Sequence, residues 1–130
     1  MLTNLALING AAPMGGLVIV SNASTLVASS CNFSNTAALG DGGAVLAVAG
    51  SSVLLSACTC TNASATYGFG GCVAALRSSV AMLNGSAFTM CSSMQGGGAA
   101  AAAFNSTVSA LYSTFSGNKC ACLDCDPVLL

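Results

Sequence analysis

Cysteines are the residues in this sequence best suited to chemistry, and three of the eight stand together near the C-terminus. Cys120, Cys122 and Cys125 form a CxCxxC pattern. Three thiolates at this spacing could bind zinc, with Asp126 or Cys91 as a fourth ligand. The alternative is a terminus pinned by disulfides, and we favour such a disulfide or thiol cluster over a metal site. A cysteine content this high also favours an oxidising compartment.

Acid–base chemistry has very few residues to use, because the chain contains no His and no Glu. Within the repeats described below, the only charged residues are Asp41 and Arg77, and they fall at different corners. Polysaccharide hydrolysis needs a pair of carboxylates. We therefore expect no enzyme, no catalytic residue, no metal and no cofactor. Two cations in the whole chain cannot neutralise a phosphate backbone, so we also expect no nucleic-acid partner.

Four Asn-x-Ser/Thr triplets are candidate N-glycosylation sites, at Asn22, Asn62, Asn84 and Asn105. A fifth triplet starts at Asn32, which abuts a predicted core residue and is the poorest acceptor. The alternative is that the corners of a repeat fold need Asn and its faces need Ser and Thr. Triplets of this kind then arise without any glycosylation, and both interpretations stay open.

Mean hydropathy is high, at +0.83, yet no segment approaches the roughly 20 apolar residues of a spanning helix. The apolar run at 10–20 ends at Ser21 and the run at 96–104 ends at Asn105. We expect no transmembrane helix. Residues 1–4 lack the basic start of a signal peptide, so we expect either that the chain is a fragment of a larger protein or that its targeting information lies outside these residues.

The sequence repeats with a period of 27–28 residues. Gly pairs recur at 15–16, 42–43, 70–71 and 97–98. Short polar pairs precede an aliphatic residue at 24–26, 51–53, 78–80 and 106–108. Two strand-length apolar runs per period lie between turn residues, and the alanine run at 99–103 fits the same frame as strand. The pattern predicts an all-β parallel solenoid of about four coils, with a partial coil at 1–14, a repeat region at 1–118 and a Cys-rich tail at 119–130 that leaves the stack.

Equal spacing predicts which side chains stack from coil to coil. The expected interior columns are Leu26/Val53/Val80/Val108, Ala28/Leu55/Met82/Ala110 and Phe33/Cys60/Ala87/Phe115, with Cys31 on Cys58 as further packed thiols. The expected outward columns are Thr25/Ser52/Ser79/Thr107 and Asn32/Thr59/Ser86/Thr114. The first Gly of a pair suits a corner that needs a positive φ.

Two short motifs resemble the repeats of chlamydial polymorphic outer membrane proteins. Gly42-Gly43-Ala44-Val45 is similar to the GGA(I/L/V) half of that repeat, and Phe115-Ser116-Gly117-Asn118 is similar to the FxxN half. The resemblance covers roughly residues 14 to 118. It implies a right-handed parallel β-helix of the pectin-lyase-like shape, in a surface-exposed passenger used for adhesion.

We therefore expect a non-enzymatic, secreted or surface-located segment of a larger protein, with a structural or adhesive role and an outer-membrane location if the resemblance holds. The ligand is expected at the cell surface or in the extracellular matrix. One alternative is a polysaccharide-binding or polysaccharide-degrading protein. Another is an ice-binding solenoid, which would require a second regular column of outward hydroxyl groups. An open strand edge at the N-terminal end also predicts end-to-end self-association.

Overall fold

The computed structural model describes residues 1–121, and every regular element in that range is a β-strand. The strands are β1 (Leu2–Thr3), β2 (Ala6–Ile8), β3 (Ala11–Ala12), β4 (Val18–Val20), β5 (Thr25–Ser29), β6 (Asn32–Ala38), β7 (Val45–Val48), β8 (Ser52–Ser56), β9 (Thr59–Ala65), β10 (Val73–Leu76), β11 (Val80–Asn84), β12 (Ala87–Thr89), β13 (Ser92–Ser93), β14 (Ala100–Ala103), β15 (Thr107–Leu111), β16 (Thr114–Ser116) and β17 (Lys119–Cys120). Within this range, no helix is long and apolar enough to cross a membrane.

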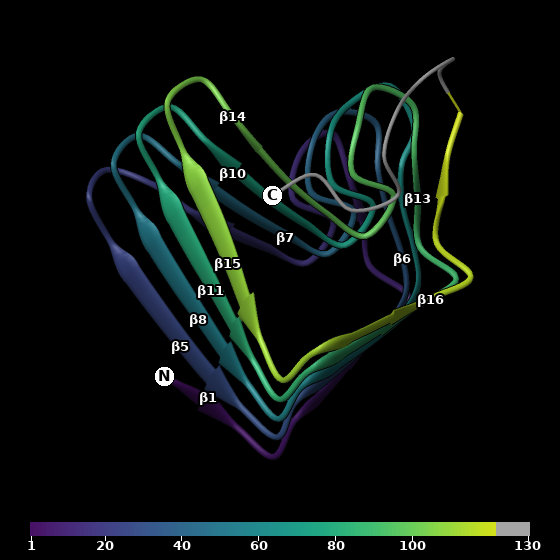
Figure 1. Cartoon of the computed structure of the whole chain (residues 1–130), viewed down its shortest axis with the longest axis horizontal. Helices are drawn as coiled ribbons and strands as arrows, with labels where there is room; N and C mark the ends of the chain where they lie inside the picture. The colour runs from purple at the N-terminus through teal and green to yellow at the C-terminus, as the bar shows by residue number, and fades with distance from the viewer. Residues whose placement is uncertain (122–130) are drawn as a thin grey trace.

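The strands form three parallel sheets, and the chain passes through each sheet once per turn (Figure 1). Sheet A has the order β1-β5-β8-β11-β15, and sheet C has the order β4-β7-β10-β14. Sheet B contains the remaining strands, centred on β6 and β9. Each strand pairs in parallel with the equivalent strand of the next turn, so the fold is the expected parallel β-solenoid of about four turns.

The corners of the solenoid are marked by residues in the left-handed region. One such column contains Asn9, Asn35, Asn62, Met90 and Gly117, with φ between 53° and 61°. The first glycine of each pair forms another column, which contains Gly15, Gly42, Gly70 and Gly97. Their φ angles lie between 52° and 66°. Asn and Gly adopt this conformation at the lowest cost, which explains their regular recurrence.

The second glycine of each pair is required for a different reason, which is close packing between turns. A Cβ atom on Gly43 would collide with the carbonyl oxygen of Gly71, and one on Gly71 would collide with that of Gly98. Both glycines lie in the buried stretch just before a sheet C strand. No side chain fits between successive turns at this corner.

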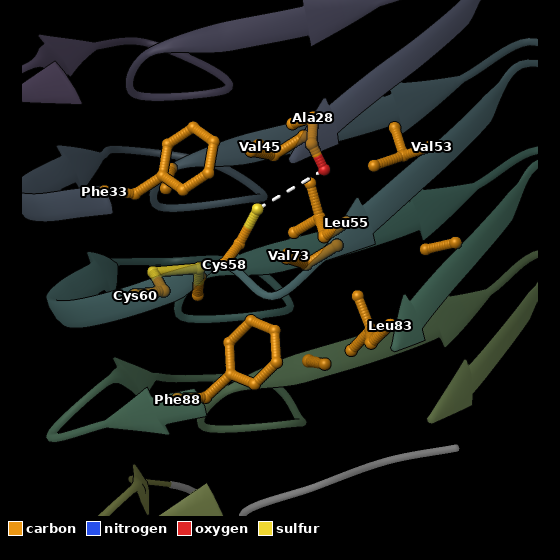
Figure 2. Packing of buried hydrophobic residues seen from close by; sticks show 14 of the residues in the cluster. Ala28, Phe33, Val45, Val53, Leu55, Cys58, Cys60, Val73, Leu83 and Phe88 are labelled. Atoms are coloured by element: carbon orange, nitrogen blue, oxygen red, sulfur yellow. Dashed lines mark hydrogen bonds between the residues drawn. A yellow bond between two sulfur atoms is a disulfide. The ribbon is translucent and has the colours of Figure 1, made fainter. Parts of the chain in front are cut away.

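The core lies between the three sheets and is made of stacked columns of small and medium apolar side chains (Figure 2). The third turn differs from the expected register by one residue. Ala81, not Val80, pairs with Val53 and Val108, and Leu83, not Met82, pairs with Leu55 and Ala110. Phe88, not Ala87, lies between Cys60 and Phe115. Val80 and Met82 instead point outward and are 37% and 48% exposed.

One extra residue in the third turn explains this correction. Ala38 pairs with Ala65, a step of 27, whereas Val45 pairs with Val73, a step of 28. The insertion therefore lies between Ala65 and Val73, where the side chain of Tyr67 is 62% exposed. The polar pairs at 51–52 and 78–79 are separated by 27 residues and conceal this shift, whereas the Gly pairs at 42–43 and 70–71 are separated by 28 and reveal it.

The alanine run forms strand β14, as expected, and pairs with β10 from Val73↔Ala100 to Leu76↔Ala103. The expectation that the chain leaves the stack at residue 119 is wrong for its first two residues. Lys119 and Cys120 pair with Ser92 and Ser93, because their backbone still continues the sheet B ladder.

Candidate functional site

A ladder of buried serines lies at the corner between sheets C and A. The backbone N–H of Ser51 donates to Ser79 Oγ at 3.1 Å, and the N–H of Ser79 donates to Ser106 Oγ at 3.0 Å. Ser24 N–H makes the equivalent bond to Ser51 Oγ at 3.2 Å. Ser51 and Ser79 are 1% and 0% exposed, so the Ser79 hydroxyl satisfies a backbone N–H of Ser51 that has no access to water. Ser79 was expected on the outer face and in fact points inward.

A second ladder at the corner between sheets A and B mixes cysteine with serine. Ser86 Oγ accepts from Cys58 N–H at 3.1 Å and donates to Leu55 O at 3.3 Å. Ser113 Oγ makes the same two bonds one turn later, to Ser86 N–H and Leu83 O. The Cys58 thiol reaches the carbonyl of Ala28 at 3.4 Å, in the position that a serine hydroxyl takes in later turns (Figure 2). Cysteine takes the donor role of serine here, because both carry one donor on a short side chain.

Three cysteine sulfurs meet inside the solenoid between sheets B and C. Cys60 and Cys72 form a disulfide with a Cα–Cα distance of 6.5 Å, and the Sγ atoms of Cys60, Cys72 and Cys91 all lie within 4.8 Å of one another. All three residues are buried. Because Cys60 and Cys72 are bonded to each other, only Cys91 of this trio keeps a thiol. The cluster therefore has the components of thiol–disulfide exchange and lacks three thiolates for a metal.

The surroundings of Cys91 hold its sulfur in the protonated form. Burial raises the pKa of this thiol from 9.0 to about 11, and hydrogen bonding with the backbone at Ala63 and Thr89 partly opposes this rise in pKa. Its Sγ also lies 3.7 Å from the carbonyl oxygen of Cys60. Burial likewise raises the pKa of Cys58. Since the thiolate is the attacking species, exchange at Cys91 is suppressed at neutral pH.

Two residues considered for catalysis lie far apart in the cross-section. Asp41 precedes sheet C, where its Oδ1 accepts the backbone N–H of Phe69 at 2.8 Å, so this carboxylate supports the turn that contains the insertion. Arg77 follows sheet C at the next corner, is exposed and has a φ of 56°. The geometry brings no second carboxylate to either residue within residues 1–121.

The C-terminal cysteine cluster is only partly within the described range. Cys120 is the last residue of β17, and its sulfur lies 3.8 Å from Ser93 Oγ. Cys122, Cys125 and Asp126 lie outside the described residues. Cys120 itself is bonded in a disulfide and so offers no thiolate to a metal, whereas the roles of Cys122, Cys125 and Asp126 stay predictions.

The four candidate glycosylation asparagines are all exposed, yet their surroundings differ. Asn62 donates from Nδ2 to Asn35 Oδ1 at 3.0 Å, and the hydroxyl of the Asn84 triplet belongs to Ser86, which is buried in the ladder. The triplets at Asn22 and Asn105 end in Ser24 and Thr107, which are exposed. Asn22, Asn62 and Asn105 also have positive φ, so each has a structural reason to be asparagine.

The outer surface of sheet B carries two adjacent columns of polar side chains, which we call the hydroxyl face. Along β6, β9, β12 and β16, alternate residues point inward or outward, and the outward ones are half-buried or exposed. The expected column is corrected by one residue, because Ala87 replaces Ser86. The second column, two residues further along each strand, was missed by sequence reasoning. The columns are Asn32/Thr59/Ala87/Thr114 and Ser34/Thr61/Thr89/Ser116.

The outer surface of sheet A is different, because an apolar column runs through it. Val27, Leu54 and Met82 pair in successive turns, and Met82 is 48% exposed. We call these three residues the apolar stripe. The columns on either side are mainly polar: Thr25/Ser52/Val80/Thr107 and Ser29/Ser56/Asn84/Leu111.

The fold and these surfaces define a parallel β-solenoid with a buried apolar interior, regular polar ladders at its corners and two unlike outer faces. Comparison of the chain with protein-family models, with curated proteins and with solved structures finds no significant match.

Sequence signals for the missed residues are present in hindsight. Cys72 follows a Gly pair and stands 12 residues after Cys60, which is about half a turn, so the two face each other across the interior. The second hydroxyl column follows from the period of two along a strand, since Thr59 and Thr61 must share one face.

Proposed function

We propose that this chain is a non-enzymatic β-solenoid segment of a secreted or surface-located protein, with a structural and adhesive role. The observation that carries the adhesive role is the apolar stripe on sheet A. Met82 is exposed and Val27 and Leu54 are half-buried, and an apolar column that reaches the surface between polar residues is typical of an interaction surface. The flanking hydroxyl and amide groups add hydrogen-bonding capacity without charge.

The core supports an extracellular setting. A disulfide between Cys60 and Cys72 is stable in an oxidising compartment and is rare where thiols are kept reduced. The accessible triplets at Asn22 and Asn105 are compatible with a glycosylated surface protein. The resemblance of the repeat to surface passenger proteins favours the same setting. Treatment with a glycosidase followed by mass measurement of the native protein tests the glycan part of this proposal.

The structural role rests on how the interior is used. The large apolar side chains fill the core, and the buried serines and cysteines bond from one turn to the next. An interior of this kind transmits rigidity along the stack, because each turn is held by backbone ladders on three sheets.

Adhesion by the apolar stripe is tested with beads that carry the full chain, applied to cell layers and to a glycan array. Replacing Leu54 and Met82 by Ser should lower bead retention several-fold, because the exposed methyl and thioether groups are lost. The matched control replaces Thr59 and Thr61 on sheet B by Ser and should leave retention unchanged. Equal retention by all three proteins would contradict the adhesive role of sheet A.

The competing function is polysaccharide degradation, and it has a direct test. Replacing Asp41 by Asn and Arg77 by Gln should leave binding intact, since an asparagine in place of Asp41 still offers an oxygen to the Phe69 N–H. If the unmodified chain releases sugars from a polysaccharide and this double variant does not, the non-enzymatic proposal is wrong.

A further inference from the structure

We infer that the hydroxyl face of sheet B binds the surface of ice. This function is separate from the proposed adhesion, because it uses a different sheet and different side chains. The sequence alone sets a requirement of two regular outward columns, and the column Ser34/Thr61/Thr89/Ser116 supplies the second one.

The polar groups of this face form a two-dimensional array. Outward residues two apart on one strand are separated by roughly 6.6 Å, and equivalent residues of successive turns by about 4.8 Å. The backbone bonds that set the second spacing are uniform. Thr59 N–H to Cys31 O, Ala87 N–H to Cys58 O and Thr114 N–H to Ser86 O are each 2.9 Å long. Ice also presents rows of oxygen atoms with repeats in this range, so a regular array can match many lattice positions at once.

The chemistry of the face suits ordered water. A threonine hydroxyl both donates and accepts hydrogen bonds, and the methyl group of the same side chain adds a small apolar surface next to it. The eight positions contain no charged residue, which would hold a hydration shell of its own, and no aromatic residue on which a sugar ring could stack. A polysaccharide is for this reason a poorer fit than ice.

The shape of the face points the same way. Small-molecule sites are concave. Two shallow hollows within residues 1–121 lie further along sheet B and its continuation, one beside Ala37 and Leu39 and the other beside Ser64 and Met94. Neither hollow is lined by a residue of the hydroxyl face. Both of these hollows therefore lie off the hydroxyl face.

Rigid support from the core pre-organises both columns. The residue between the two outward positions of each strand points inward, giving the column Phe33/Cys60/Phe88/Phe115. Figure 2 shows the first three of these side chains. The rings of Phe88 and Phe115 stack with centroids 5.2 Å apart, and Cys60 is tied to Cys72. A surface held in this way loses little conformational entropy when it binds.

The array has one defect that provides a sharp test. Ala87 interrupts the first column between Thr59 and Thr114, and its side chain is half-buried on the outer surface. Replacing Ala87 by Thr should complete the column and raise the thermal hysteresis of a solution of the full chain. Replacing Thr61 by Lys should lower thermal hysteresis several-fold and abolish the shaping of ice crystals. The long charged side chain would prevent close contact between the hydroxyl face and the ice surface.

The matched control is Ser56→Lys, which adds the same side chain on the outer surface of sheet A. It should leave thermal hysteresis unchanged, and far-ultraviolet circular dichroism should show the same fold for all variants. The inference is overturned if the unmodified chain neither shapes ice nor shows hysteresis, or if Ser56→Lys is as harmful as Thr61→Lys. Retention on an insoluble neutral polysaccharide without ice shaping would also overturn it. Adhesion by the apolar stripe is measured separately with Leu54 and Met82 variants, so the two proposals can fail independently.

Discussion

Ser51 and Ser79 are joined across one turn by a bond from the Ser51 backbone N–H to Ser79 Oγ, 3.1 Å long and fully buried. The two residues lie 28 positions apart, which is the length of the turn that contains the insertion. At this corner a serine side chain takes the place of the carbonyl acceptor that the backbone N–H finds elsewhere in the ladders. A serine in each turn therefore holds this corner of the stack together.

Replacing Ser79 by Ala should lower the free energy of unfolding by about 1–3 kcal/mol, because the buried Ser51 N–H loses its acceptor and gains no water. Urea unfolding followed by circular dichroism measures the change. Ser52→Ala, one residue after Ser51 and half-buried on the outer side of β8, is the control and should cost much less. Equal costs would show that the ladder contributes little.

Replacing Gly71 by Ala should prevent normal stacking, because its Cβ would collide with the carbonyl oxygen of Gly98 and with backbone atoms of Ser92. We expect loss of the folded state or a large fall in melting temperature. Gly85→Ala makes the comparison informative. Gly85 has a φ of 56° and open space within 4 Å of where a Cβ would lie, so only the roughly 1 kcal/mol cost of a left-handed alanine applies. A milder effect at Gly71 than at Gly85 would contradict the packing argument.

Stability should fall as the pH rises from about 9 to about 11. In the folded chain the pKa of Cys91 is raised from 9.0 to about 11, so the unfolded chain loses this proton first. The unfolded state then binds fewer protons than the folded state, and the free energy of unfolding decreases with pH. Two pKa units correspond to a loss of about 3 kcal/mol.

Chemical unfolding at a series of pH values tests this dependence. Cys91→Ala should flatten the curve and leave only the smaller contribution of Cys58, whose pKa is also raised. Alanine is tolerated in this column, since Ala63 occupies it one turn earlier. Disulfide mapping after an acid quench verifies that no exchange with Cys60 or Cys72 has occurred. An unchanged slope in the variant would assign the effect to other groups.

Removing the disulfide by replacing Cys60 and Cys72 with Ala should cost about 3 kcal/mol, as expected for a loop of 12 residues. A reductant should lower the melting temperature of the unmodified chain at least to the same extent. The double variant keeps the disulfide of Cys120 and should respond less. A response of the double variant as large as that of the unmodified chain would place the stabilising bond elsewhere. No stability difference at all would mean that the three sheets hold this turn without the cross-link.

The N-terminal edge of the stack should promote association. Strands β1 to β4 pair on one side only, and Leu7 ends the interior column above Phe33. We expect concentration-dependent oligomers in size-exclusion chromatography with light scattering. Leu7→Lys should make the chain monomeric by placing a charge at the open end of the column, whereas Ile8→Lys, on the outer surface, should not. A clean monomer of the unmodified chain would contradict the prediction.

The repeat, the strand content and the closed core could all be predicted from the sequence. Gly pairs at a period of 27–28 and alternating residues along a strand are local signals, because corners require particular backbone angles and strands have a period of two. The interior columns of the first two repeats followed correctly from these signals, from Leu26 on Val53 and from Phe33 on Cys60.

Which side chains stack from turn to turn depends on the exact number of residues in each turn. Only the tertiary structure showed that number for the third turn. One inserted residue near Tyr67 moved Ala81, Leu83 and Phe88 into the core, because a shift of one residue reverses the face of every side chain on a strand. The sulfur cluster is likewise a consequence of folding. Cys60, Cys72 and Cys91 are spread over 31 residues of sequence, and only the closure of the coil and the stacking of the next turn bring their sulfurs within 4.8 Å.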